Sequence, residues 1–169
     1  ISGPRSGQFV DATVEHAWSD FDHPLKAVED RADNDLHVFP YGELQTVVKA
    51  ARLPALCTGA VSGLQSKFLR MVTLQVTDIN AGIKLIEQLK RSWPSATPVK
   101  DLFVYKIVDG GAINQLLLLW GFNNFEEYGN SEQLQEALAA AETALKVKAV
   151  EAITSETLVY RADMSLFPD

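Results

Sequence analysis

The stretch FLRMVTLQVT at residues 68–77 constrains the fold of this chain most, because its residues alternate in character. One set is apolar apart from Arg70, and the other set is mixed, as expected for a β-strand between unlike environments. Asp78 then stands at a natural N-cap position, and apolar residues follow at helical spacing until Pro94. This segment predicts a strand followed by an amphipathic helix.

Two further strands are predicted after that helix. Residues 101–108 and 112–120 are rich in Val, Ile, Leu and aromatic residues. They are separated by Asp109 and two glycines, which is a signal for the turn of a hairpin. Residues 121–129 predict a loop or a short turn of helix.

A second helix and a last strand complete the pattern. The spacing of Asn130 and Gln133 resembles a capping box, and it opens an Ala-rich helix with apolar residues along one stripe. Residues 149–162 predict a strand that returns to the sheet. The order over residues 68–162 is therefore β-α-β-β-α-β, the ferredoxin-like arrangement of an α+β fold.

This topology predicts a sheet with one open face. Both helices are expected on the same side of the sheet, because each βαβ crossover should be right-handed. The other face would then expose more apolar surface than a monomer usually tolerates. We therefore expect this face to be covered, either by another part of the chain or by a second copy.

The first 67 residues are expected to form a smaller α/β segment that packs on the sheet. Its predicted elements are strands at 9–18 and 36–42, helices at 22–32 and 43–53, and a linker or loose strand at 57–66. Two interpretations are open. The segment is either a reduced or diverged copy of the same unit, which makes the chain an internal pseudo-dimer, or an extension that wraps one domain. We favour the reduced copy, and we expect residues 163–169 to form a tail.

The acidic balance of the chain excludes two classes of partner. A formal net charge of −7 leaves no strongly basic region to neutralise phosphates, so we expect neither nucleic acid nor an anionic membrane as a partner. The longest wholly apolar runs are Leu116 to Trp120 and Ala137 to Ala141. Both are far shorter than the roughly 20 residues of a membrane-spanning helix.

Cys57 is the single cysteine, so the chain has no internal disulfide and no cysteine-based metal motif. A lone cysteine suits a reducing compartment and slightly favours the cytoplasm. The start at Ile1 is also compatible with export after cleavage of a signal peptide.

The segment LLLLWGFNNFEEY shows the most specific resemblance of this chain to a known family. Its Trp120, Phe122, Asn124, Glu126 and Tyr128 follow a spacing of the type W-x-F-x-S/N-x-E-x-Y. Together with the order of elements, this resembles the dimeric α/β-barrel superfamily, which includes antibiotic-biosynthesis-type monooxygenases and NIPSNAP-like proteins. The resemblance implies two sheets packed face to face, in a homodimer or a tandem repeat, with a ligand in the barrel interior.

Two functions follow from this resemblance. The first is the binding of a small hydrophobic or aromatic molecule, with a cofactor-independent monooxygenase or isomerase reaction on it. The alternative is a non-enzymatic assembly module whose open sheet face mediates dimerisation. A cavity of roughly 300 Å³ or more on the open face, lined by convergent polar groups, would favour the first function.

Four aromatic or polar residues are candidates for ligand binding in the sheet domain. Trp120, Asn123 and Tyr128 cluster at the end of the predicted third strand, where indole and amide groups can frame a pocket. Trp120 can instead fill the core, and Asn123 can be a turn residue. Tyr105 alternates with Lys106 on the neighbouring strand, so only one of them faces a cavity.

His16 is a fifth candidate, in a segment at residues 16–23 that holds two imidazoles and two carboxylates. These groups can bind a divalent metal or pair for general-base chemistry. We favour the simpler interpretation of turn residues before a helix, because no third ligand follows at metal-binding spacing. No metal site is predicted. Arg70 is interpreted as an edge-strand charge rather than as the partner of an acidic group.

Overall fold

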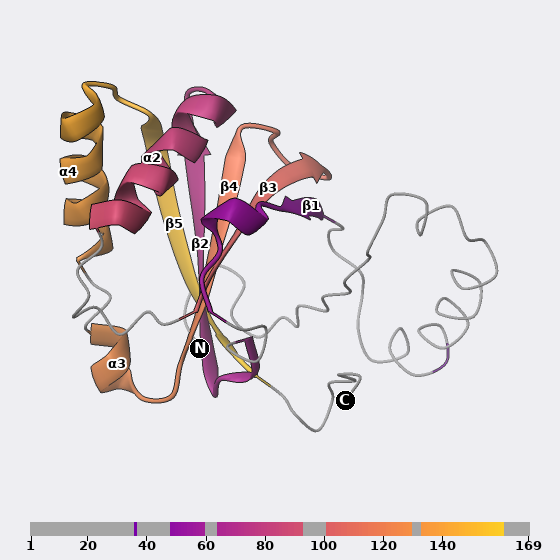
Figure 1. The fold of residues 1–169 in the computed structure, drawn as a ribbon. Coiled ribbons are helices and arrows are strands. Elements are labelled where there is room, and N and C mark those ends of the chain that lie inside the picture. The colour runs from indigo at the N-terminus through magenta and orange to yellow at the C-terminus, as the bar shows by residue number, and fades with distance from the viewer. Residues whose placement is uncertain (1–35, 37–47, 60–63, 93–100, 130–132, 161–169) are drawn as a thin grey trace. The chain divides into compact units, whose positions relative to one another are not determined.

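Residues 68–159 fold in the order strand–helix–strand–strand–helix–strand (Figure 1). The structure is a computed structural model that describes residue 36 and residues 48–59, 64–92, 101–129 and 133–160. The elements of this region are β2 (Phe68–Val76), α2 (Ile79–Ser92), β3 (Leu102–Asp109), β4 (Gln115–Phe122), the short α3 (Phe125–Gly129), α4 (Leu134–Leu145) and β5 (Val150–Val159). The predicted ferredoxin-like α+β fold is therefore confirmed here.

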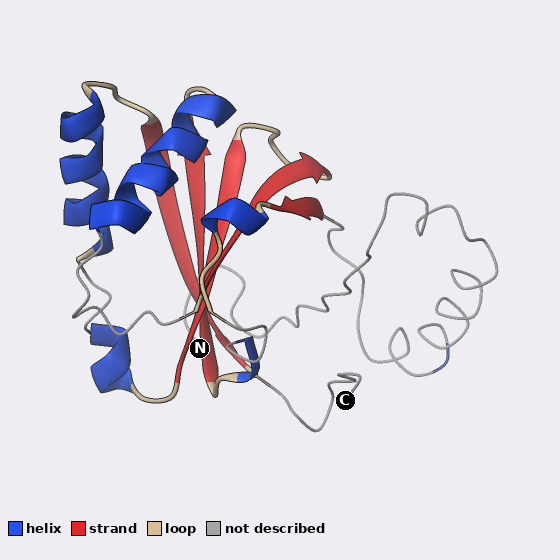
Figure 2. Ribbon diagram, viewed as in Figure 1, coloured by secondary structure: helices blue, strands red, loops and turns tan. Residues whose placement is uncertain are grey.

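The sheet contains five strands in the order β1-β3-β4-β2-β5, and each neighbouring pair is antiparallel. The last four strands of this order form the ferredoxin-like set. The first, β1 (Lys49–Arg52), pairs with β3 and is followed by the 3-10 turn η2 (Pro54–Leu56). Both long helices, α2 and α4, lie on one side of the sheet (Figure 2), as predicted.

The alternation seen in the sequence of β2 separates the two faces of the sheet. Val72, Leu74 and Val76 are fully buried, whereas the residues between them are half-buried. The buried side chains join a core between the sheet and the helices, whose members from the other elements include Val104, Leu116, Leu118, Leu85, Ile86, Leu89, Leu138 and Ala141. The even-numbered residues of β2, β3 and β4 therefore face the helices.

The N-cap expected at Asp78 is present, since its Oδ1 accepts a hydrogen bond of 2.9 Å from the backbone N–H of Ala81. The hairpin between β3 and β4 is also confirmed. Its turn contains Gly110 at φ +75°, a conformation that favours glycine.

The second strand of the hairpin begins at Gln115, three residues later than predicted. Asn114 instead pairs with the end of β2. The backbone N–H of Val76 donates to the carbonyl of Asn114 at 2.9 Å, and the side-chain amide of Asn114 donates to the carbonyl of Val76 at 2.8 Å. This pairing with β2 lengthens the loop after β3.

Residues 49–52 form a strand, so the helix predicted over 43–53 is wrong for these residues. Half-buried Lys49 and Ala51 alternate with exposed Ala50 and Arg52, and all four pair with β3. Backbone hydrogen bonds to the edge of β3 stabilise the extended conformation of this segment. This stabilisation exceeds the weak helix propensity of so short a segment.

The chain continues along β3 after η2, where the sequence predicted a linker or a loose strand. The backbone N–H of Thr58 donates to the carbonyl of Leu102 at 2.8 Å, and the N–H of Leu102 donates to the Thr58 hydroxyl at 3.0 Å. Leu56 is buried in the core. The segment from Lys49 to Thr58 is therefore joined to the sheet and, through Leu56, to its core.

Several predictions fall outside the described residues. These are the elements at 9–18, 22–32 and 36–42 apart from Leu36, residues 43–47 of the helix predicted over 43–53, the capping residue Asn130 and the tail at 163–169. The other residue of the predicted capping box, Gln133, is itself the N-cap of α4 and makes no side-chain cap hydrogen bond, so its predicted place in the first turn of the helix is wrong. Among the helices that the structure describes, none combines the length and the apolar character that a membrane crossing requires.

Candidate functional site

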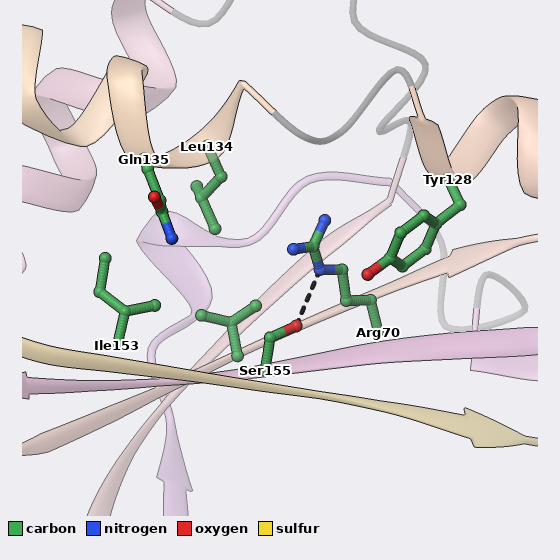
Figure 3. Close-up of a pocket in the computed structure, with 7 residues that line it drawn as sticks. Arg70, Tyr128, Leu134, Gln135, Ile153 and Ser155 are labelled. Carbon is green, nitrogen blue, oxygen red and sulfur yellow. Dashed lines mark hydrogen bonds between the residues drawn. The ribbon is translucent and has the colours of Figure 1, made fainter. Parts of the chain in front are cut away.

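A cavity of about 360 Å³ opens between α3, α4 and strands β2 and β5. The described residues that line it are Arg70, Val72, Tyr128, Leu134, Gln135, Ile153 and Ser155 (Figure 3). Three of these side chains are aliphatic and four carry polar groups. The volume lies in the range of small-molecule pockets, and the lining is more polar than is usual for them.

Arg70 is the charged residue in the described lining. It occupies the same face of β2 as Val72, Leu74 and Val76, so its side chain points toward the helices. The interpretation of Arg70 as an edge-strand charge is wrong, because β2 lies between β4 and β5. Arg70 is half-buried, so its guanidinium loses part of its hydration, and contacts with other groups offset this loss.

Two aromatic rings and one hydroxyl supply such contacts. The guanidinium carbon of Arg70 lies 4.7 Å from the centroid of the Tyr128 ring and 5.4 Å from that of Trp120. The Nε–H of Arg70 donates to the Ser155 hydroxyl at 3.0 Å (Figure 3). The two cation–π contacts restrain the plane of the guanidinium, and the hydrogen bond restrains its rotation.

The β-sheet register brings these partners together. Arg70 pairs with Trp120 on β4 and with Thr157 on β5, so the Trp120 ring lies beside it on the same face. Ser155 lies two residues before Thr157 and shares its face. Thr157 is 6% exposed, and it is the buried polar residue among those that the structure describes.

A local motif of hydrogen bonds starts the short helix that carries Tyr128. The Asn124 side chain accepts a hydrogen bond from the backbone N–H of Glu127 at 2.9 Å. The Glu127 carboxylate accepts one in return from the N–H of Asn123 at 2.7 Å. This reciprocal pattern resembles a capping box. The spacing of Asn124 and Glu127 in the sequence is the signal that could have revealed it.

Aromatic packing then places the Tyr128 ring. Its centroid lies 5.1 Å from that of Phe122 and 6.0 Å from that of Phe125. Phe68 stacks on Phe122 at 5.3 Å, which joins the cluster to the first residue of β2. Such rings restrict Tyr128 to one position over Arg70.

The structure places the five residues predicted to bind a ligand in different environments. Tyr128 lines the cavity, and Trp120 is 2% exposed within the core, beneath Arg70. Asn123 is exposed, and its side-chain oxygen accepts a hydrogen bond from the N–H of Lys67 at 3.4 Å. Tyr105 alternates with core residue Val104 and so lies on the opposite face of the sheet. His16 lies outside the described residues.

Sequence reasoning missed Arg70, Gln135 and Ser155 as members of the site. The charge of Arg70 within an apolar strand face was the available signal, and its interpretation required knowing that β2 is internal to the sheet. Ser155 and Gln135 carry no signal of their own, because polar residues on a strand or a helix are usually surface residues.

A second group of polar side chains lies at the edge formed by β1 and β3. The Arg52 guanidinium lies 5.4 Å from the Phe103 ring centroid, and its hydrogen bond with the Cys57 side chain raises its pKa. Burial raises the pKa of Tyr105, although the positive charge of Arg52 opposes this rise. The N–H of Val104 donates to the Cys57 sulfur at 3.4 Å, which ties this sulfur to the sheet.

No metal centre is visible in the part of the chain that the structure describes, because no three His, Cys, Asp or Glu side chains gather there. The cavity lies on the helix-covered face of the sheet. It therefore differs in position from the ligand site in a barrel interior that the sequence resemblance implies, and it does not lie on the open face, where a cavity was expected for small-molecule binding.

Comparisons with known proteins reveal one structural similarity. No protein-family profile and no curated protein sequence matches the chain. The structure resembles the crystal structure of a "putative monooxygenase" from Lactobacillus acidophilus NCFM, with 17% sequence identity and a TM-score of 0.42. The alignment covers 61% of this chain and 47% of that protein, so this chain matches about half of its length. These values do not establish membership of a family.

Proposed function

We propose that this protein binds a small hydrophobic or aromatic molecule in the cavity between α3, α4, β2 and β5. The observation that carries this proposal is the arrangement of Arg70, held against two aromatic rings at the wall of a partly aliphatic cavity. Aliphatic side chains from Val72, Leu134 and Ile153 can contact the body of the ligand. A few fixed polar groups can orient the ligand, as polar groups usually do in small-molecule pockets.

The activity proposed for the bound compound is a cofactor-independent monooxygenase or isomerase reaction. The sequence resemblance to the dimeric α/β-barrel superfamily suggests this class, although it implies a ligand on the opposite face of the sheet, so the place of the reaction in this cavity is proposed from the lining residues alone. Arg70 supports it chemically, since a positioned cation stabilises negative charge that develops on an adjacent substrate oxygen. The hydroxyls of Ser155 and Tyr128 belong to the same cavity and can orient the substrate.

Ligand-detected NMR with a panel of small neutral and anionic aromatic compounds tests the binding proposal. Ile153→Trp should fill the cavity and abolish binding, because Ile153 is a half-buried lining residue. Ile113→Trp is the matched control, since Ile113 is 72% exposed in the loop after β3. Binding that survives Ile153→Trp would show that the ligand lies elsewhere. Oxygen uptake and mass spectrometry of the bound compounds then test the reaction.

Assembly through the face of the sheet opposite α2 and α4 is a second candidate function. Leu69, Met71, Leu117 and Leu119 alternate with core residues and are half-buried on that face. A cluster of four large apolar side chains on central strands is typical of an interface. This interface would form with a second copy in a homodimer or with the first segment of the chain in an internal pseudo-dimer.

Sedimentation velocity of the full chain distinguishes these arrangements. Leu119→Lys should convert a homodimer into a monomer, because it buries an unpaired ammonium group in the interface. Exposed Ala139→Lys on α4 is the matched control and should leave the sedimentation coefficient unchanged. A monomeric wild-type chain would exclude the homodimer and leave the internal arrangement.

A further inference from the structure

We infer that Ser155 selects the ligand of the cavity by donating a hydrogen bond to a carbonyl oxygen of that ligand. This inference rests on the proposed function, because it adds the polar group that the bound molecule carries and the residue that recognises it. Three features support it: the place of Ser155 on β5, the hydrogen bond that its oxygen accepts, and the aliphatic side chains of the cavity.

β5 presents Ser155 to the cavity. This strand pairs with β2 as the last strand of the described sheet, and Ile153 and Ser155 both line the cavity from it. Figure 3 shows the Ser155 side chain on the same side of the sheet as those of Arg70 and Ile153. Because Ser155 is exposed, a molecule in the cavity can reach its hydroxyl without a rearrangement of the strand.

The hydrogen bond with Arg70 restricts the direction of the Ser155 proton. The Nε–H of Arg70 donates to the Ser155 oxygen at 3.0 Å, so this oxygen acts as the acceptor in their contact. A guanidinium accepts no hydrogen bond, and the hydroxyl proton must therefore point away from it. Among the residues that the structure describes, no group accepts a hydrogen bond from the Ser155 hydroxyl. Its proton is thus available to a ligand.

The same contact makes Ser155 a stronger donor. A hydroxyl that accepts a hydrogen bond from a cation is polarised, and its own O–H then binds an acceptor more strongly. This effect requires only the bond between Nε and the hydroxyl oxygen, whatever the other nitrogens of Arg70 contact.

The aliphatic part of the lining determines which acceptor fits. The side chains of Val72, Leu134 and Ile153 offer no hydrogen bond. A carbonyl group placed beside them loses hydration, and this costs free energy unless its oxygen accepts a hydrogen bond. The single donor of Ser155 meets this requirement. The ligand class that we infer is therefore a carbonyl compound with an aromatic or aliphatic body.

The test uses two naphthalene compounds of similar shape. 2-Acetylnaphthalene carries a carbonyl group where 2-isopropenylnaphthalene carries a carbon–carbon double bond. Ligand-detected NMR gives the ratio of their affinities for the full-length protein, and the change of this ratio in a variant cancels the different hydration of the two compounds. In Ser155→Ala the ratio of ketone to alkene affinity should fall about three- to tenfold.

Thr154→Ala is the matched control, because it removes a hydroxyl from the neighbouring, exposed residue of β5, which lies on the opposite face. It should leave the ratio unchanged. Ser155→Thr keeps a hydroxyl and should retain most of the ratio. Thermal unfolding of each variant shows whether it folds.

Infrared spectroscopy of the ketone labelled with carbon-13 at its carbonyl group gives a direct measurement. A hydrogen bond polarises a carbonyl group and lowers its stretching frequency. The frequency of the bound ketone should be lower in the wild type and in Ser155→Thr than in Ser155→Ala. A loss of stability alone would not move it. An identical frequency in the wild type and Ser155→Ala would overturn the inference.

The possible outcomes separate the two proposals. An equal loss of affinity for both compounds in Ser155→Ala would overturn the role of Ser155, while loss of both in Ile153→Trp would still support the cavity as the binding site. If neither compound binds but another aromatic compound does, and Ile153→Trp abolishes its binding, the inference fails and the proposed function stands. If no compound binds, both fail.

Discussion

The guanidinium of Arg70 lies 4.7 Å from the ring centroid of Tyr128, although the two residues are 58 positions apart in the chain. One comes from an internal strand and the other from a five-residue helix. Their contact connects the sheet to α3 at the wall of the cavity. The stability of this corner of the fold and the shape of the cavity therefore depend on the same pair.

Replacing Tyr128 with leucine should destabilise the protein by about 1–2 kcal/mol. The substitution removes a cation–π contact with Arg70 and the ring contacts with Phe122 and Phe125. Tyr128→Phe keeps the ring and should cost about 1 kcal/mol or less. Urea unfolding measures both values. Equal losses in the two variants would assign the effect to the hydroxyl rather than to the ring.

Gly82 in α2 should not tolerate alanine. A Cβ at this position would lie 3.0 Å from side-chain carbons of Leu116 and Val76, both fully buried. Overpacking typically costs about 1–3 kcal/mol, which equals or exceeds the gain of about 1 kcal/mol in helix propensity. We expect a net loss in the free energy of unfolding.

Gly129→Ala at the end of α3 is the control for Gly82→Ala, because nothing lies within 4 Å of its added Cβ. It should be neutral or slightly stabilising. If both variants gained stability, the close approach of α2 to the sheet at Gly82 would be refuted.

Glu142 should be required for the connection between α4 and β5. Its Oε1 accepts hydrogen bonds of 2.7 Å from the backbone N–H groups of Ala149 and Val150. Hydrogen bonds to a charged acceptor contribute about 1.5–3 kcal/mol, so Glu142→Ala should lower stability by that order. Amide hydrogen exchange should also accelerate at Ala149 and Val150.

The control for this variant is Glu87→Ala on the exposed side of α2. It removes the same charge, and it should change neither stability by more than about 0.5 kcal/mol nor the exchange of these two amides. A loss of stability in Glu142→Ala without faster exchange would point to an effect elsewhere in α4.

Stability should decline at alkaline pH through Tyr105. Burial raises the pKa of its hydroxyl above the ordinary value of 10.0 in the folded protein. The unfolded chain then loses the proton first, so the stabilising contribution is complete below pH 10 and is lost as the pH rises through the folded pKa. Tyr105→Phe should remove this part of the pH dependence in unfolding experiments.

Ultraviolet titration of the phenolate provides a second measurement of Tyr105. Arg52→Gln should raise the pKa of Tyr105 further, since the charge of Arg52 now lowers it. The difference spectrum between the wild type and Tyr105→Phe isolates this residue. Ionisation of Tyr105 below its ordinary pKa would contradict the burial argument.

Local patterns predicted most of the fold between residues 68 and 159. The alternation in β2 and the Asp78 cap depend on neighbouring residues, and the structure shows both. The short strand at Lys49–Arg52 could not be predicted in this way. Its extended backbone depends on hydrogen bonds to β3, a strand that begins 50 residues later in the chain.

Only the aromatic residues of the candidate site were predicted from the sequence. Trp120 and Tyr128 were selected because aromatic residues at the end of a strand often frame pockets. Arg70 and Ser155 join them through the pairing of β2 with β4 and β5, which no local spacing reveals.

The sequence by itself determined which residues of each strand and helix are apolar, and thereby the ferredoxin-like order of elements. The tertiary structure decided that β2 is internal, so that Arg70 contacts Trp120, Tyr128 and Ser155. The physical reason is the range of the interactions. Periodicity and capping act over a few residues, whereas strand order sets which distant side chains share one face and can form a binding site.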